Sequence, residues 1–353
     1  MKPSTASAFA GAASAMLLVG TSAAVSATIA DYPVLAGQAL RYGLAATILM
    51  AVVRHQRPPR VRLTPRDHLL LLALAATGLA GFNLFLVEAT RHAGPAMIGT
   101  VIGAVPLVLA LAGPLMEHRR PTPRTVGAAL VVALGAAVAA GLGSGSLPGL
   151  LLSLGALACE VAFSLLALPL LPRIGPLRVA AYPAALSVPM LLAASLALEG
   201  TTVLRLPTPG EAAAFGYLGA IVTAAAFFLW YDALRRLGAD RAGLFAGLVP
   251  VGALVTTVAL GLGQAGPADV TGALLVASGV YLGFGRPSRV SRGARRPRAS
   301  LHEPVRSALR RRPDPVPPRV SSRTTTGPGP AGPPRRPSSE LPTPAAATAV
   351  PLD

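Results

Sequence analysis

Charged residues and cysteine are scarce in this sequence. Asp, Glu, Lys and Arg make up 13% of the 353 residues, whereas a soluble domain carries about 25%. Cys159 is the single cysteine, which excludes an intramolecular disulfide and a metal cluster built from cysteines. The five histidines show no HExxH spacing, so the sequence predicts no metal centre.

Motifs for nucleotide chemistry are missing as well. No GxxxxGK[ST] occurs, so the chain carries no Walker-type ATPase of its own. A GxGxxG string at Gly261, Gly263 and Gly266 ends a hydrophobic run and follows no strand, so we attribute it to coincidence. We predict no cofactor and no enzyme. A membrane-embedded enzyme acting on lipids is the less favoured alternative, because the loops offer mainly Arg and few carboxylates.

Long hydrophobic runs dominate the rest of the chain. A transmembrane helix needs roughly 20 mostly apolar residues, and the runs are continuous rather than alternating with period two, which argues against a β-barrel. The sequence therefore predicts an all-α integral membrane protein with ten transmembrane helices. The predicted spans are 8–30, 33–53, 69–90, 95–116, 125–142, 149–171, 176–198, 212–234, 241–262 and 268–285.

The basic residues are distributed unevenly, which argues against nucleic acid as the partner of this chain of net charge +17. Fourteen of the 31 lie in 286–353, and only Arg91 and Arg205 lie in the second set of alternate loops. Cytoplasmic loops retain Lys and Arg, so we predict a multi-pass protein of the cell membrane with both termini in the cytoplasm. The first set of alternate loops, with thirteen Arg, is 54–67, 117–124, 172–178 and 235–241.

The hydrophobic part of the sequence occurs twice. A shift of 144 residues lays 89–106 on 233–250 with seven identities in 18 positions. Five spans per half place the second half in the opposite orientation, so we predict inverted repeats over 1–142 and 143–285. Such repeats place a substrate site near the bilayer midplane and permit alternating access. The repeat also requires 8–30 to be a retained span rather than a signal peptide.

The C-terminal segment 286–353 differs in composition from the rest, with 15 Pro and 14 Arg. Such a segment buries too little apolar surface to fold, so we predict a disordered cytoplasmic tail. Six Arg lie within Arg286–Arg298. They would either bind anionic lipid headgroups or form a solvated stretch that only helps to fix orientation.

Two charges lie far from both ends of their predicted spans. Arg41 is eight residues into the second span, and Glu160 is near the middle of the sixth. A charge at this depth normally faces a cavity or a partner. A guanidinium could bind a substrate carboxylate or phosphate, and a buried carboxyl group could pass protons. Alternatively, the two side chains pair with each other or with backbone carbonyls.

Two acidic residues each precede an Arg by three positions near a span end, namely Glu88 with Arg91 and Asp232 with Arg235. Residues three apart share a helical face. The simpler interpretation is an interfacial ion pair that closes a span. The alternative is a pair of gates at opposite membrane faces that open in turn.

Prolines and aromatic residues give further candidates. Pro106 and Pro250 fall mid-span at matching positions, and paired helix interruptions indicate a transporter's binding region, although a packing kink is the alternative. Trp230 and Tyr231 could stack on a substrate or belong to an interfacial aromatic belt. Asn83 is a further polar candidate. The preceding glycines would allow close helix packing; they are Gly99, Gly103, Gly243 and Gly247.

At these residues the chain resembles the EamA branch of the drug/metabolite transporter superfamily. The segments that carry the resemblance are QALRY at 38–42, EATRHAGPAMIGTVIGAVPLVLAL at 88–111 and YDALRRLGADRAGLFAGLVP at 231–250. The resemblance covers about 8–285. It implies ten helices in two inverted halves and secondary transport of small metabolites, often export of amino acids or drugs. Arg41, Pro106, Pro250 and Glu117 match recurrent positions, but Gln264 stands where the family usually has Glu.

We therefore expect a secondary transporter, in the exporting direction, that binds a small molecule in a midplane cavity. The alternatives are a lipid flippase and a non-transporting membrane scaffold. The sequence decides neither the substrate nor whether the chain forms a homodimer.

Overall fold

The computed structural model describes residues 5–59, 61–141, 146–200 and 205–283, and the regular structure of these residues is entirely helical. The predicted tail 286–353, with its Arg286–Arg298 stretch, lies outside the described residues. The first half contributes α1 (Thr5–Ala27), α2 (Val34–Gln56), α3 (Pro65–Leu74), the π-helical η1 (Ala75–Gly81), α4 (Phe82–Thr90), α5 (Pro95–Ile102), α6 (Val105–Met116) and α7 (Pro123–Ala140).

The second half contributes a matching series of elements. They are α8 (Leu147–Leu165), α9 (Leu171–Leu198), α10 (Pro209–Tyr217), the π-helical η3 (Leu218–Ala225), α11 (Ala226–Leu237), α12 (Ala239–Gly243), the 3₁₀ segment η4 (Leu244–Gly247), α13 (Leu248–Ala259) and α14 (Pro267–Gly283). Three helix starts recur after 144 residues: 65 and 209, 95 and 239, and 123 and 267. The π-helical segments also occupy matching positions.

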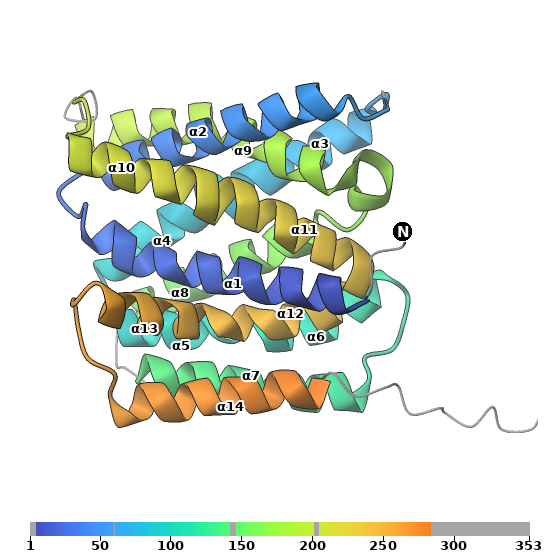
Figure 1. The fold of residues 1–353 in the computed structure, drawn as a ribbon, viewed down its shortest axis with the longest axis vertical. Coiled ribbons are helices and arrows are strands. Elements are labelled where there is room, and N and C mark those ends of the chain that lie inside the picture. The colour runs from blue at the N-terminus through green and yellow to red at the C-terminus, as the bar shows by residue number, and fades with distance from the viewer. Residues whose placement is uncertain (1–4, 60, 142–145, 201–204, 284–353) are drawn as a thin grey trace, which may run out of the picture. The chain divides into compact units, whose positions relative to one another are not determined.

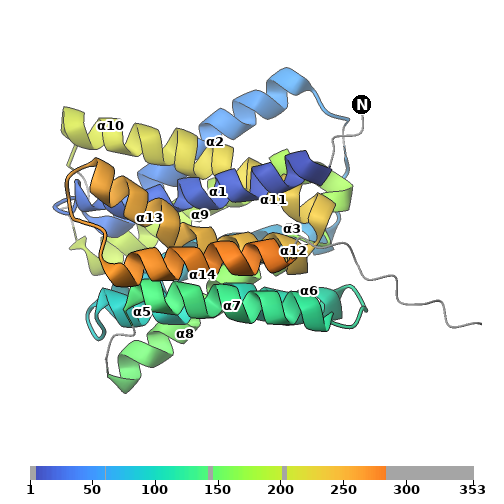
Figure 2. The same ribbon diagram turned by 60° about the horizontal axis from the view of Figure 1, so that its bottom comes forward.

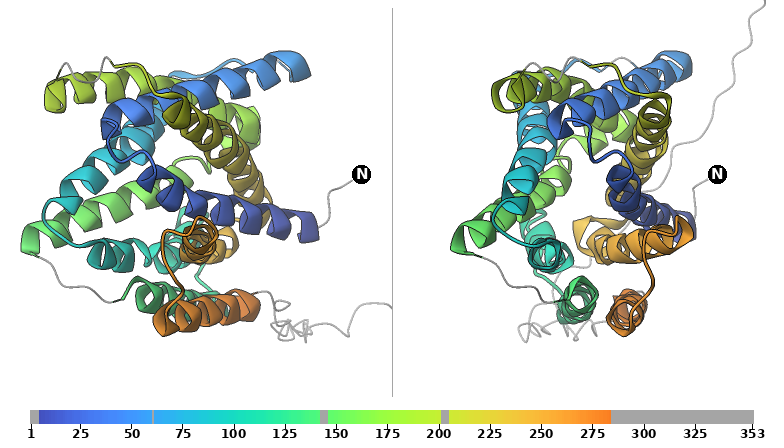
Figure 3. Two further views of the ribbon diagram at one scale, coloured as in Figure 1. Left: turned by 60° about the vertical axis from the view of Figure 1, so that its left-hand side comes forward. Right: turned by 90° about the vertical axis from the view of Figure 1, so that its left-hand side faces the viewer.

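Helices of the two halves alternate in space (Figure 1). At one side of the bundle α2 packs on α9, and at the other α7 packs on α14, while α1 contacts both α11 and α13. The rotated view shows α14 alongside α7 (Figure 2). Views from the side show the same pair together at the foot of the bundle (Figure 3). Each half therefore packs against the other rather than folding as a separate body.

Helix starts are encoded by matching capping boxes. The Thr64 side chain caps α3 together with Asp67, and 144 residues later Thr208 caps α10 together with Glu211. In each case the Thr hydroxyl accepts from an orphan amide while the acidic side chain accepts from the cap residue's amide. The sequence TPxD/E thus sets the same helix start in both halves.

Small residues let α7 and α14 pack closely. A Cβ added to Gly135 would lie 2.7 Å from the backbone nitrogen of Val276, and one added to Gly272 would lie 2.6 Å from the Gly135 carbonyl. Without a hydrophobic driving force between helices in lipid, such close backbone approach is a main source of association.

Nine helices among the described residues are long and apolar enough to cross a membrane. The nine include the combined segments Pro65–Thr90, Pro95–Met116, Pro209–Leu237 and Ala239–Ala259. These helices define a multi-pass membrane protein. α14 has 17 residues within the described part of the chain, so the tenth span stays a prediction.

The predicted limits of the sixth span are wrong at its C-terminal end. The sequence predicts 149–171, but α8 ends at Leu165, and α9 contains a break at Gly175, where φ is 80°. The intervening residues are as apolar as the helices, so hydropathy carries no signal of the turn. The second break, at Gly175, depends on backbone geometry, because glycine adopts positive φ without steric cost.

Four other spans are interrupted, and two of the interruptions lie beside Pro106 and Pro250, where the sequence predicts them. The fourth breaks between α5 and α6 at Gly103–Ala104, and the ninth contains the 3₁₀ segment η4 just before Pro250. The third and eighth contain the π-helical segments. A proline disrupts the hydrogen bond to the carbonyl four residues back, which explains the first two breaks but not the π segments.

Candidate functional site

One cavity of about 820 Å³ lies between helices of both halves. Its lining reaches Ser26, Val34 and Pro95, near the loops that hold few Arg, and includes Gln264 in the loop before α14. None of the described residues of the four Arg-rich loops lines it. We call the two ends of the bundle the arginine-poor end and the arginine-rich end. The cavity therefore extends from mid-bundle toward the arginine-poor end.

Arg41 on α2 lines this cavity and is held by neutral partners. Its Nε donates to the Thr223 hydroxyl at 2.6 Å, and its Nη1 donates to the Gln38 side-chain oxygen at 3.4 Å. No ion pair of Arg41 is found among the described residues. The guanidinium, which is always protonated in proteins, therefore has further N–H donors for a bound anion.

Glu160 on α8 lines the same cavity. In the described part of the chain, its carboxylate has neither an ion-pair partner nor a hydrogen-bond partner in the protein, and in particular it does not pair with Arg41. It lies close enough to Tyr42 and Tyr231 to interact with them electrostatically. The cavity thus contains one guanidinium and one carboxyl group, and neither has an ion-pair partner among the described residues.

Asn83 also lines the cavity, and two hydrogen bonds hold its side chain in place. Its side-chain nitrogen donates to the Leu79 carbonyl at 2.7 Å and to the Tyr42 hydroxyl at 3.1 Å. Only 4% of Asn83 is exposed, so its polar groups lie in the cavity wall and not at the lipid surface. Tyr42 is a cavity residue that sequence reasoning missed, although it directly follows Arg41 in the family-like segment.

Aromatic rings close the inner end of the cavity. Phe163 lies 4.8 Å from Phe227 and 5.0 Å from Tyr231, measured between ring centroids. Trp230 lines the cavity and donates from Nε1 to the Ser164 hydroxyl at 3.2 Å. The Tyr231 hydroxyl donates to the Phe163 carbonyl at 3.3 Å.

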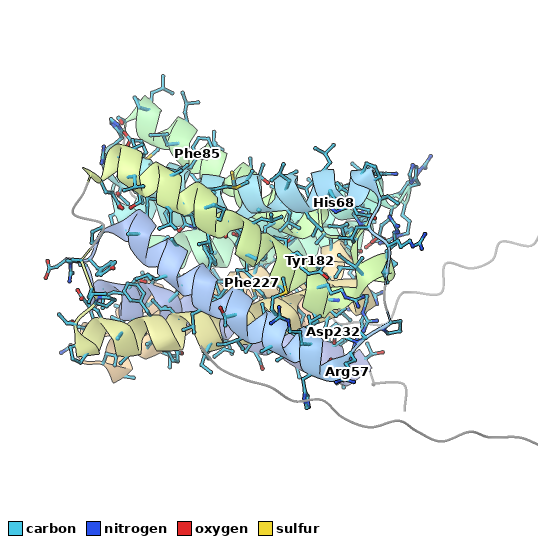
Figure 4. The ribbon with its side chains drawn as sticks, turned by 90° about the horizontal axis from the view of Figure 1, so that it is seen from above. Arg57, His68, Phe85, Tyr182, Phe227 and Asp232 are labelled. Carbon is cyan, nitrogen blue, oxygen red and sulfur yellow. The ribbon has the colours of Figure 1, made fainter. Side chains whose placement is uncertain are left out.

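Burial separates these rings from the lipid surface. Trp230 is 3% exposed and Tyr231 is fully buried, so the interpretation as a lipid-facing aromatic belt is wrong for both. Tyr231 does not line the cavity but supports Phe163 from behind. Figure 4 shows Phe227 near mid-bundle, with Asp232, Arg57 and His68 toward the same end.

The two prolines are placed differently. Pro250 lines the cavity, whereas Pro106 does not and its neighbour Val105 does. Each follows a break in the helix, at Gly103–Ala104 and in η4 respectively. Among the glycines before them, Gly99 and Gly103 line the cavity, while a Cβ on Gly247 would lie 2.2 Å from Val132 Cγ1.

Ion pairs gather at the arginine-rich end. Arg119 bonds Glu117 at 2.5 Å and lies 3.5 Å from buried Asp240, so it connects the loop after α6 with the start of α12 in the other half. The hydrogen bond to Glu117 raises the pKa of Arg119, which therefore stays charged. Arg173 pairs with Asp67, again across the halves. These contacts join the two halves at the end that the cavity does not reach.

The two pairs that the sequence predicts each form within one helix and its C-terminal cap. Glu88 lies 3.2 Å from Arg91, and Asp232 lies 2.8 Å from Arg235. Asp232 also bonds Arg236 at 2.5 Å. Neither pair joins separate elements, so a gating role for them stays a prediction.

Thr223 and Gln38 are further residues of the candidate site that sequence reasoning missed. Both contact Arg41. Gln38 lies one helical turn before Arg41, which is a usable signal. Thr223 is 182 residues away, so no local pattern could have identified it.

A bundle of membrane-spanning helices around a largely apolar cavity that holds Arg41 and Glu160 is an architecture typical of membrane transporters. The chain belongs to the EamA-like transporter family, whose model matches residues 6–141 and 147–284. A similar protein is the "Uncharacterized transporter YetK" of Bacillus subtilis strain 168, which is 24% identical over 70% of this chain and 78% of its own length. A solved structure described as "Crystal structure of protein" has the same fold, with a TM-score of 0.67 and 20% identity over 79% of this chain and 97% of its own.

Proposed function

We propose that this protein is a secondary transporter that binds small solutes between Arg41 and Glu160 and carries them by alternating access. One observation supports this proposal above all. The cavity between the two halves contains a guanidinium and a carboxyl group that have no ion-pair partner in the part of the chain that the structure describes. Because unpaired charges inside a membrane protein are costly, their retention indicates a ligand that supplies the missing partners.

Alternating access needs two related halves that can exchange roles. The family model matches the chain twice, and the helix starts and π segments recur after 144 residues. These findings support two inverted five-helix repeats over 1–142 and 143–285. At about 1.5 Å per residue, the 17 residues of α14 are long enough for the tenth span, which the inverted arrangement requires.

The charge distribution assigns the arginine-rich end to the cytoplasm. The cavity then faces outward in this conformation, and both termini lie inside the cell. The Arg119 and Arg173 ion pairs keep the cytoplasmic end closed. In the opposite conformation they would separate, and the helical pairs Glu88–Arg91 and Asp232–Arg235 are candidates to rearrange with them. Figure 4 places Asp232 at the same end as Arg57 and His68.

The cavity chemistry defines the solute class. The N–H groups of Arg41 suit an anionic group, and Glu160 suits a cationic or hydrogen-bond-donating group. Trp230 and Phe227 offer apolar faces beside them. We therefore expect small solutes that carry both kinds of group, moved out of the cell and driven by their own gradient or a proton gradient.

Metabolite profiling tests this proposal. Cells that produce the wild-type chain should release one class of small solute, and Arg41→Ala or Glu160→Ala should abolish the release at equal membrane abundance. Arg54→Ala is the matched control, because Arg54 is an exposed arginine near the end of the same helix α2. A profile identical to that of an empty-vector strain would refute export, and a flux that tracks lipid composition would favour a flippase.

A further inference from the structure

The hydrogen bond between Arg41 and Thr223 joins the two halves inside the membrane. Arg41 lies on α2 and Thr223 on η3, and the Nε–Oγ1 distance is 2.6 Å. Thr223 is fully buried and does not line the cavity. Its hydroxyl therefore contacts the guanidinium from behind, on the side away from a bound solute.

The direction of this hydrogen bond is fixed by the helix. A hydroxyl has one O–H to donate, and Thr223 donates it to the Leu218 carbonyl at 2.8 Å, five residues back. The oxygen is then left to accept from Arg41. In a regular α-helix the nearest carbonyl would lie four residues back, so the π-helical segment sets the orientation of the acceptor.

A glycine brings the two elements together at this point. A Cβ on Gly219, in the first turn of η3, would lie 2.9 Å from Leu44 Cδ2 and 3.1 Å from the Arg41 carbonyl. Because Gly219 has no side chain, η3 can approach α2 closely at Arg41. Thr223, one turn further along, then reaches the Arg41 guanidinium.

We propose that Thr223 is the positioning residue of the solute site, holding Arg41 by Nε so that the outer N–H groups face the cavity. The inference rests on the proposed function and adds a residue that does not touch the solute. Nε and one Nη1 hydrogen are used by Thr223 and Gln38. The other three of the five guanidinium N–H groups remain for an anionic group.

A chemical test of this role needs no transport. Phenylglyoxal modifies guanidinium groups, and the extent of reaction at Arg41 is read by mass spectrometry of the purified full-length chain. Thr223→Val removes the anchor and frees the guanidinium to move, so Arg41 should react at least threefold faster. Thr223→Ser keeps the hydroxyl and should restore the wild-type rate.

Thr77→Val is the matched control. Thr77 lies in the π-helical segment of the first half and donates to the Ala73 carbonyl at 2.7 Å, without contact to Arg41. It should leave the rate at Arg41 unchanged. Equal rates at Arg41 in wild type, Thr223→Val and Thr223→Ser would overturn the proposal.

Counterflow of a ¹⁴C-labelled amino-acid mixture in proteoliposomes measures the consequence for transport. Hydrogen bonds to charged groups contribute roughly tenfold or more to an equilibrium constant, so Thr223→Val should raise the half-saturation concentration about tenfold with little change in maximal rate. On an Arg41→Lys background, which lacks Nε, the same substitution should change it less than twofold. A full effect on that background would show that Thr223 acts independently of Arg41 and contradict the proposal.

The reactivity and counterflow experiments test the positioning role and the transport function separately. If the wild-type chain shows no counterflow but Arg41 reactivity responds to Thr223→Val, the proposed function fails for this probe while the positioning role stands. If counterflow is strong but reactivity and half-saturation ignore Thr223, transport stands and the positioning role is refuted.

Discussion

In the first half of the chain the π-helical segment Ala75–Gly81 makes room for an aromatic ring, whereas the matching segment Leu218–Ala225 holds a charge. A Cβ on Gly78 would lie 2.8 Å from Phe163 Cβ, so η1 accommodates the wall of aromatic rings. Thr223 of η3 bonds Arg41 instead. The π-helical segment therefore packs against an aromatic side chain in the first half and accepts a hydrogen bond from a charged side chain in the second half.

The charged residues of the cavity also differ between the two halves. A shift of 144 residues lays Arg41 on Ala185, Glu160 on Met16 and Thr223 on Leu79. Helix starts, caps and interruptions are repeated, but the charged side chains of the cavity are not. The two halves therefore match in backbone geometry and differ in the chemistry that they contribute to the cavity.

The largest effect should come from the asymmetric charges. Arg41→Ala and Glu160→Ala each remove a proposed charge-assisted contact with the solute, and we expect transport to fall about 10- to 150-fold, since such contacts contribute about 1.5–3 kcal/mol each. Ala185→Ser, at the position that matches Arg41, should change it less than twofold. Initial rates at equal membrane abundance measure both. Equal losses at the two matching positions would mean that the site is symmetric.

The next effect concerns the packing of the two halves. Gly135→Ala places a Cβ 2.7 Å from the backbone of α14, so the helices must separate and the melting temperature should fall by several degrees. Gly127→Ala on the same helix α7 meets no atom within 4 Å and should slightly raise it, because Ala is favoured over Gly in a helix by up to ~1 kcal/mol. Thermal unfolding in detergent measures both. A drop of similar size for Gly127→Ala would show that helix propensity, not close packing, dominates here.

Closure of the arginine-rich end should depend on contacts between halves more than on contacts within a helix. Asp240→Asn removes the carboxylate 3.5 Å from Arg119, so a cysteine at Ala242, buried in this structure, should react with a maleimide about fivefold faster in a Cys159→Ala background. Asp232→Asn breaks only the pairs with Arg235 and Arg236 and should have a smaller effect. If Asp232→Asn accelerates labelling as strongly, the helical pair is itself a gate.

The smallest effect tests the repeated caps. Thr64→Ala and Thr208→Ala each remove an N-cap, which contributes about 1 kcal/mol. Because the two capping boxes match, the two melting temperatures should fall by similar small amounts. A large fall in melting temperature for one substitution and none for the other would show that the two caps do not contribute equally to stability.

Hydropathy and spacing predicted most of the fold, because each long apolar run is mainly helical and the repeat is visible in Gly, Pro and Arg. The charged candidates Arg41 and Glu160, with Asn83, Pro250 and Trp230, all line one cavity. Pro106 and Tyr231 do not, because each lies just behind a lining residue. These differences depend on side-chain direction, which span limits accurate to a few residues cannot resolve.

The features that sequence missed are those with no local signal. The turn after Leu165 lies in an apolar stretch, and the π-helical segments carry no proline to mark them. The Arg41–Thr223 and Arg119–Asp240 contacts join residues 182 and more than 100 positions apart. Only the packing of one half on the other creates them.

The most direct test of the central claim is transport by the purified protein in liposomes with an imposed gradient of the solute found by profiling. We predict that the wild-type chain moves this solute across the bilayer, and that Arg41→Ala and Glu160→Ala protein, folded and inserted to the same extent, does not. Wild-type protein that moves no solute under any imposed solute or proton gradient would contradict the account.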